Sequence, residues 1–206
     1  MKSMQRETLL KLIAETAYNA GYGAKKHFAT YDIIEKLPGW VALLSAAAAI
    51  LALFIPAFEA KWVSATFIII SIGAGNILLY DRDKTKYAEV GTALTGRFHE
   101  LRVLYHEVKT QPDGSDLPDH AKRHAAIQAA VLNTNVSKQI FLSDWYAHYK
   151  FFWQQQTGWV DEQLKFTLFR DMLPLSFTVA VILVFLGTIG WLVSGRVTPL
   201  LCQFFR

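Results

Sequence analysis

Three stretches without a charged residue dominate this sequence. They run from Leu37 to Phe58, from Trp62 to Tyr80 and from Met172 to Gly195, and contain 22, 19 and 24 residues. A bilayer core of roughly 30 Å takes about 20 helical residues, so each stretch is long enough to cross a membrane. We therefore predict an all-α integral membrane protein with three transmembrane helices and a cytoplasmic helical bundle.

The predicted spans divide the chain into three parts. Residues 1–110 would form a helix, a transmembrane hairpin with spans at 38–58 and 62–80, and a second helix. Residues 111–171 would form a cytoplasmic loop and aromatic-rich helices, and residues 172–206 a third span with a short tail. In a chain of 206 residues this leaves no room for a separate catalytic domain, and we expect no enzyme.

The charged residues indicate how the chain lies in the membrane. Near the spans, nine Lys and Arg residues fall on one side and three on the other. Since positively charged flanks resist translocation, we expect the N-terminus and residues 81–171 in the cytoplasm and the C-terminal tail outside a bacterial inner membrane. Residues 81–171 carry 12 basic and 12 acidic residues without a basic stripe, which disfavours direct nucleic-acid binding.

No pattern in the sequence predicts a catalytic, cofactor or metal site. There is no phosphate-binding glycine loop, no nucleophile elbow and no dense Cys and His cluster. A pair four residues apart, His120 and His124, has the spacing of two zinc ligands but no accompanying carboxylate pattern. We expect this pair on a solvated helix face.

The helices on either side of the hairpin carry matching seams. Apolar or small residues recur there at alternating spacings of three and four. Both helices adjoin the same membrane face, so we predict an antiparallel stalk in which large residues of one helix meet small residues of the other, for example Ala20 with Phe98. The alternative is that both seams face other partners, such as the third cytoplasmic helix or a neighbouring subunit. The central residues of the predicted seam are Ala17, Ala20, Ala24, His27, Gly91, Leu94, Phe98 and Leu101.

One seam position is titratable. His27 falls opposite Gly91 in the predicted pairing, where a change of protonation would alter the stalk. The simpler interpretation is a buried imidazole satisfied by one hydrogen bond.

A loop and a second long helix are predicted after the stalk. Two prolines and an Asp-Gly pair mark Gln111 to Asp119 as a loop, whereas no proline or glycine interrupts Asp119 to Gln156. The window from Ile140 to Phe169 holds ten aromatic residues. They favour packing on the stalk, and an amphipathic helix at the lipid head groups is the alternative.

Small residues within the spans predict helix association. Pairs four residues apart let helix backbones approach closely in lipid, and a polar amide in a span bonds to a neighbouring helix in many cases. Three spans of one chain do not use all of these faces, so we expect a homo-oligomer. The predicted association residues are Ser45, Ala49, Ser71, Gly75, Asn76, Gly190 and Ser194.

Two segments carry a resemblance to a known family. The sequence YNAGYGAKKHFATYDIIEKL before a tight hairpin, and YDRDKTKYAEVGTALTGRFHELRVLYHEV after it, resemble the SLATT domains, two-span effector modules of bacterial antiphage and conflict systems. The resemblance covers roughly residues 5–110 and rests on element order, the small-residue helix with His27 and the aromatic seam. The third span departs from the simplest two-span pattern.

The resemblance implies a membrane effector that permeabilises or depolarises the inner membrane when a partner reports infection. Such partners are a nucleotide-second-messenger synthetase, its product, or a reverse transcriptase. The resemblance transfers no ligand-binding residue. A non-lytic scaffold that anchors a cytoplasmic partner has the same sequence features and stays open as the alternative.

Overall fold

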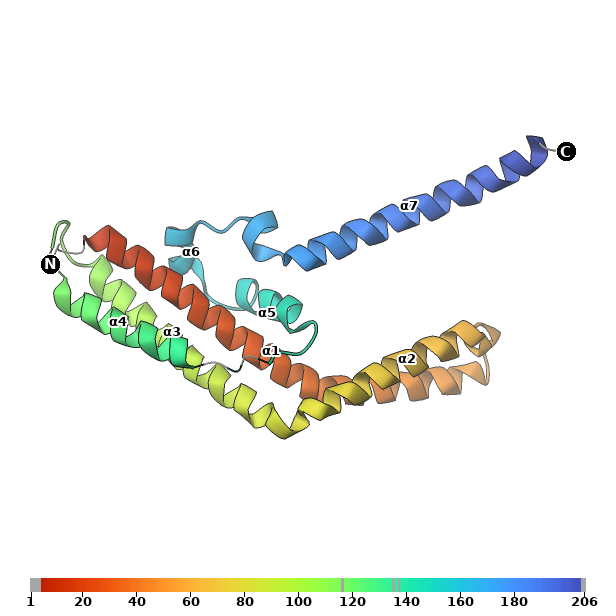
Figure 1. Cartoon of the computed structure of the whole chain (residues 1–206), viewed down its shortest axis with the longest axis horizontal. Helices are drawn as coiled ribbons and strands as arrows, with labels where there is room; N and C mark the ends of the chain where they lie inside the picture. Colours follow the sequence, from red (N-terminus) through yellow and green to blue (C-terminus); the bar gives the residue numbers. More distant parts are fainter. Residues whose placement is uncertain (1–4, 116, 135, 137, 205–206) are drawn as a thin grey trace. The chain divides into compact units, whose positions relative to one another are not determined.

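The computed structural model describes residues 5–115, 117–134, 136 and 138–204, without the side chains of residue 169 and of residues 193 onward. All regular secondary structure in this part of the chain is helical (Figure 1), and three helices are long and apolar enough to cross a membrane. The predicted fold class is confirmed. The chain forms two compact units, residues 1–165 and residues 166–206.

The first helix, α1 (Arg6–Ala52), contains both the predicted N-terminal helix and the first span. It runs for 47 residues and continues through Pro38. It ends before the predicted limit of the span at residue 58, because Ile55 precedes Pro56 and takes an extended conformation that a helix cannot hold. A short 3-10 turn, η1 (Pro56–Glu59), then reverses the chain.

The return path has three parts. Helix α2 (Lys61–Ile77) lies beside the second half of α1 and completes the hairpin (Figure 1), and α3 (Lys84–Lys109) follows. A 3-10 stretch, η2 (Leu78–Asp83), separates them, although the sequence predicts no break there. At this point Lys84 Nζ lies 2.8 Å from Glu35 of α1 and 3.0 Å from Asp81, which fastens the start of α3 to α1.

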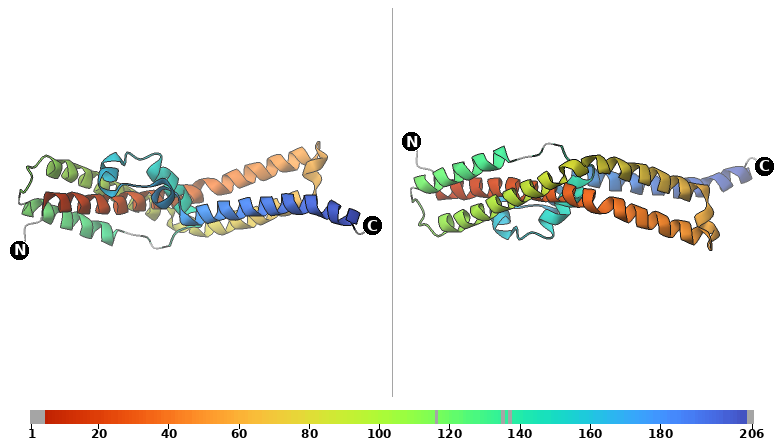
Figure 2. Two further views of the ribbon diagram at one scale, coloured as in Figure 1. Left: turned by 90° about the horizontal axis from the view of Figure 1, so that it is seen from above. Right: turned by 90° about the horizontal axis from the view of Figure 1, so that it is seen from below.

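The remaining helices of the first unit surround the α1–α3 pair. Helix α4 (Pro118–Asn133) runs beside α1 and α3 (Figure 2), while α5 (Ser143–Phe152) and α6 (Gly158–Leu164) pack against α1. The prediction of a single helix from Asp119 to Gln156 is wrong. After Asn133 the chain leaves the helix, and we call residues 134–142 the linking segment. Among its described residues, Val136, Lys138 and Gln139 bond to α1 or α3.

The second unit contains the third candidate span. A π-helical turn, η3 (Leu168–Met172), precedes α7 (Leu175–Phe204). The described side chains of α7, up to Leu192, are almost all apolar and exposed, as expected for a helix whose surroundings are lipid.

Candidate functional site

The seam between α1 and α3 is the best-packed part of the molecule. All eight predicted seam residues are buried. Two large-to-small contacts lie one residue further along α1 than predicted: Phe98 lies over Gly21 together with Phe151 of α5, and the ring of Phe28 lies over Gly91. The sequence analysis overlooked Gly21 and Phe28, because a strict heptad assigns them to positions beside the seam.

Residues from three helices, α1, α3 and α5, therefore meet at Gly21. A Cβ atom on Gly21 would lie 2.8 Å from both Phe98 and Phe151, so only glycine fits there. Trp159 of α6 completes the cluster, with its ring centre 5.4 Å from that of Phe98 and 5.1 Å from that of Tyr105. Phe151 and Trp159 thus belong to the core of the stalk, in agreement with the prediction that aromatic residues of this window pack on it.

His27 joins the linking segment to the stalk. Its Nδ1 donates to the carbonyl of Gly23 at 2.7 Å, so Nε2 is the acceptor, and the amide of Val136 donates to it at 3.2 Å. Burial lowers the pKa of His27, which keeps the ring neutral and able to accept this bond. Both ring nitrogens of His27 therefore have hydrogen-bond partners, whereas the simpler interpretation of the sequence expected one hydrogen bond.

Two further bonds hold the linking segment. The hydroxyl of Thr30 donates to Gln139 Oε1 at 2.6 Å, and the hydroxyl of Tyr87 on α3 donates to the carbonyl of Lys138 at 2.6 Å. Ile140 is buried against Ile34 and Tyr87. These contacts explain why the helix breaks here, since they replace the helical bonds of the segment with bonds across α1 and α3.

The expectation of a solvated His120 and His124 pair is wrong for His124. This side chain is 5% exposed, and its Nε2 lies 2.9 Å from the hydroxyl of Thr16 on α1. Burial lowers its pKa. Among the described residues, no three His, Cys, Asp or Glu side chains lie close enough together to hold a metal ion.

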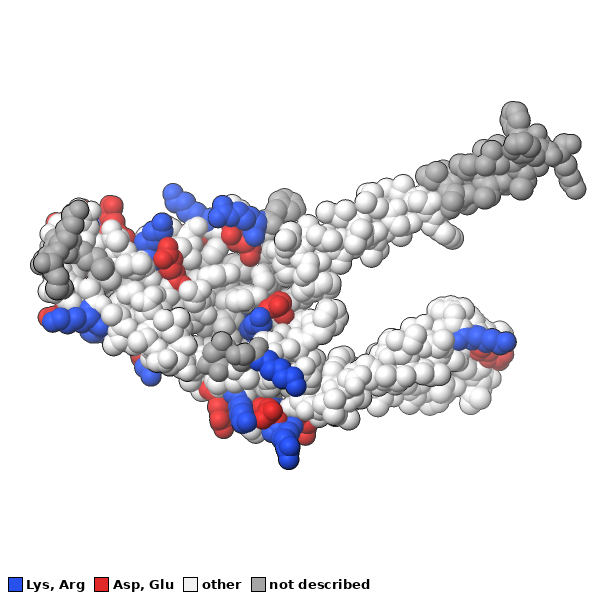
Figure 3. Space-filling model, viewed as in Figure 1, with Lys and Arg blue, Asp and Glu red and all other residues white. Residues whose placement is uncertain are grey.

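The hairpin presents its predicted association residues to the outside. Ala49, Ser71, Gly75 and Asn76 are exposed, and Ser45 is half-buried. The amide of Asn76 donates to the carbonyl of Ile72 in its own helix at 3.2 Å. In α7, Gly190 has open space around it, and the side chain of Ser194 lies outside the described residues. The surface of the hairpin is uncharged between charged groups at its base and its tip (Figure 3).

An apolar groove of about 790 Å³ lies where the hairpin meets the linking segment and α5. Its walls come from the inner ends of both hairpin spans and from residues 140–146. We call it the base groove. Leu142, in its wall, has a left-handed backbone with φ of 68°, a conformation that non-glycine residues seldom adopt.

The comparison with family models decides the identity of this arrangement. Residues 4–190 match the model described as SMODS and SLOG-associating 2TM effector domain 6. The chain belongs to this SLATT family. No curated protein and no solved structure matches the chain.

The match extends the resemblance seen in the sequence. It reaches residue 190, so it includes the linking segment, α5, α6 and much of α7, and not only the region up to residue 110. The family description is that of a two-span membrane effector domain, and this chain is one of these domains.

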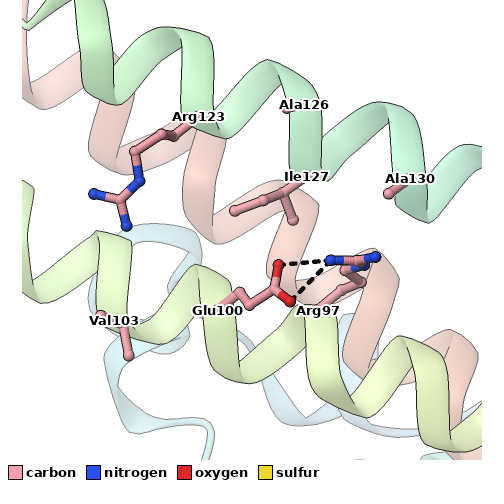
Figure 4. Close-up of a pocket in the computed structure, with 7 residues that line it drawn as sticks. All are labelled: Arg97, Glu100, Val103, Arg123, Ala126, Ile127 and Ala130. Atoms are coloured by element: carbon pink, nitrogen blue, oxygen red, sulfur yellow. Dashed lines mark hydrogen bonds and ion pairs between the residues drawn. The ribbon is translucent and has the colours of Figure 1, made fainter.

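The SLATT domain has a second cavity, which lies outside the hairpin. A cavity of about 550 Å³ lies between α3 and α4, with Ile127 and Val103 among its apolar residues (Figure 4). Its two guanidinium groups are engaged: Arg97 lies 2.8 Å from Glu100, and Arg123 contacts Glu107 at 2.5 Å. An anionic ligand would have to displace these carboxylates, so the cavity is not prepared for one.

Proposed function

We propose that this SLATT domain oligomerises in the bacterial inner membrane and permeabilises it when its defence system is triggered. The proposal is carried by the outer faces of the hairpin, where Ala49, Ser71 and Gly75 are exposed and leave room for a second helix to approach. Lipid tails are as apolar as the side chains of the spans, so the hydrophobic effect does not drive two helices together within a bilayer. Association depends instead on close packing, which small residues allow.

The stalk is the proposed route by which a trigger acts on the membrane. Helix α1 continues from the stalk into the hairpin without a break, so a change in its packing on α3 also moves the first span. A trigger can only shift such an equilibrium by binding one arrangement more tightly than the other.

The trigger is proposed to act from the cytoplasm, where the positive flanks of the spans would place the stalk. The family description names SMODS and SLOG as associated domains, which supports a nucleotide-second-messenger synthetase or its product as the partner.

The test is membrane potential in cells that express the full chain from an inducible promoter. We expect loss of the potential, read with a voltage-sensitive dye, as the protein accumulates in the membrane fraction. Cells that keep a normal potential while the protein is abundant and its partner present would exclude a pore. That result would support the scaffold instead.

A further inference from the structure

The base groove adjoins the inner ends of both hairpin spans. Val41 in its wall belongs to the first span, and Ile70, Gly73 and Ile77 belong to the second. The opposite wall, with Phe141 and Trp145, comes from outside the hairpin. In a bilayer, a groove in this place would lie beside the part of each acyl chain that is close to its head group, and water cannot fill it favourably.

The lining of the groove excludes most soluble ligands. No lining residue in the described part of the chain is charged, and its one side-chain amide, of Asn76, already bonds to Ile72. Phe141 is 84% exposed, an unusual state for a side chain of this size outside the spans. The groove is therefore suited to a flexible hydrocarbon chain.

The rim of the groove carries one exposed lysine. Lys138 Nζ lies 4.4 Å from the ring centre of Tyr80, which lines the groove, and its side chain is exposed. A smaller cavity of about 180 Å³ shares Ile33, Leu37 and Tyr146 with the groove and adds Trp40 and the ion pair of Lys36 with Asp32. A cation at Lys138 and an aromatic ring at Trp40 match the phosphate and the interface region of an anionic lipid.

We propose that the base groove binds an acyl chain of an anionic phospholipid, with the phosphate of the lipid at Lys138. The lipid then contacts both the hairpin and the linking segment, which itself is bonded to His27, Thr30 and Tyr87. Loss or exchange of this lipid would act on the segment that holds α1 and α3 together.

Photolabelling of the full chain in nanodiscs tests the proposal. The probe is phosphatidylglycerol with a diazirine in one acyl chain, in a phosphatidylcholine bilayer. Trypsin cleaves after Lys138 and Lys150, so the peptide of residues 139–150 reports labelling of the outer wall of the groove. We expect label on this peptide, and its absence would overturn the proposal.

Two matched variants test whether the groove holds the labelled chain. Gly73 lines the groove and has no atom within 4 Å of an added Cβ, whereas Ala65 on the same helix is exposed and does not line the groove. Gly73→Phe should lower labelling of the 139–150 peptide about tenfold, the effect of removing roughly two methylene groups from apolar contact. Ala65→Phe should leave it unchanged. Equal labelling in all three proteins would overturn the proposal.

The head-group contact has its own test. Lys138→Gln should remove the preference for phosphatidylglycerol over a phosphatidylcholine probe, read on the longer peptide of residues 124–150 that this variant yields. A preference that persists would place the phosphate elsewhere. Because Gly73 lies outside the proposed association face, a failure here leaves the proposal of oligomerisation untouched.

Discussion

The amide of Val136 donates a hydrogen bond to Nε2 of His27, 109 residues earlier in the chain, at 3.2 Å. This bond exists only while the imidazole is neutral, because a protonated ring has no acceptor. The linking segment is therefore attached to α1 through a group whose protonation would break the attachment, and burial lowers the pKa of this group.

Stability should fall in mild acid. Because burial lowers the pKa of His27 below its usual 6.5, the unfolded chain takes up this proton at a higher pH than the folded chain does. The free energy of unfolding should be constant well above pH 6.5 and decrease as the pH falls below it. The thermal midpoint in detergent, measured against pH, checks this.

Burial also lowers the pKa of His124, so both histidines contribute to the loss of stability in acid and two variants are needed to separate them. His27→Gln should remove one part of the decrease, and His124→Gln the other. The hydroxyl of Tyr87, whose ring is a neighbour of His27, does not titrate in this range, because burial raises its pKa above the usual 10. If the pH dependence of His27→Gln matched that of the unmodified chain, His27 would not be the responsible group.

Gly21→Ala should destabilise the stalk. The new methyl group would lie 2.8 Å from the rings of Phe98 and Phe151, and such overpacking costs about 1–3 kcal/mol. Gly96→Ala is the control on the same stalk, because nothing lies within 4 Å of its added Cβ and it should stabilise α3 by about 0.5–1 kcal/mol. Two changes of the same sign in the melting midpoint would contradict the observed packing.

The ion pair of Asp32 and Lys150 should couple α1 to α5. Burial acts to raise the pKa of Asp32, but the hydrogen bonds from Lys150 and Lys36 outweigh it and hold this pKa below its usual value. A double-mutant cycle of Asp32→Asn and Lys150→Met should give a coupling of about 1–3 kcal/mol. The pair of Lys26 and Asp144 joins the same helices but is more exposed, and its cycle should give less than about 1 kcal/mol. Equal coupling energies for the two pairs would mean that burial does not set the strength of these ion pairs.

Gly75→Leu should weaken self-association without altering the fold of the chain. Gly75 is exposed on α2 and has open space around it, so the added side chain keeps a second helix at a distance. Ala65→Leu on the same helix does not share the four-residue spacing of Ser71 and Gly75 and serves as the control. Energy transfer between labelled chains in vesicles measures the difference. If both variants lost energy transfer, or if both kept it, the assignment of Gly75 to the association face would be wrong.

The spans and the stalk follow from local patterns, and the linking segment does not. Runs of uncharged residues and a heptad seam are properties of single helices, so the uncharged stretch Leu37 to Phe58 and the eight buried seam residues can be recognised without knowledge of the rest. The break at residues 134–142 has no proline or glycine to mark it. It exists because His27, Thr30 and Tyr87 offer bonds from a distant part of the chain.

His124 illustrates the same limit within the candidate site. Its neighbours along α4 are polar or small, which is typical of a solvated face, and only the approach of Thr16 from α1 buries it. The base groove cannot be recognised in the sequence either, since one wall comes from residues 33–80 and the other from residues 140–146. Phe141 belongs to the aromatic window from Ile140 to Phe169, but unlike Phe151 and Trp159 it is exposed and does not pack in the core.

Pro38 gives α1 a particular mechanical character. Proline cannot donate to the carbonyl four residues earlier, so α1 lacks one hydrogen bond at Ile34, between its stalk half and its hairpin half. Bending of a helix is easiest at such a place, because fewer backbone hydrogen bonds resist it. A change in the packing of the stalk would therefore alter the angle at Pro38 between the distal half of α1 and the first span.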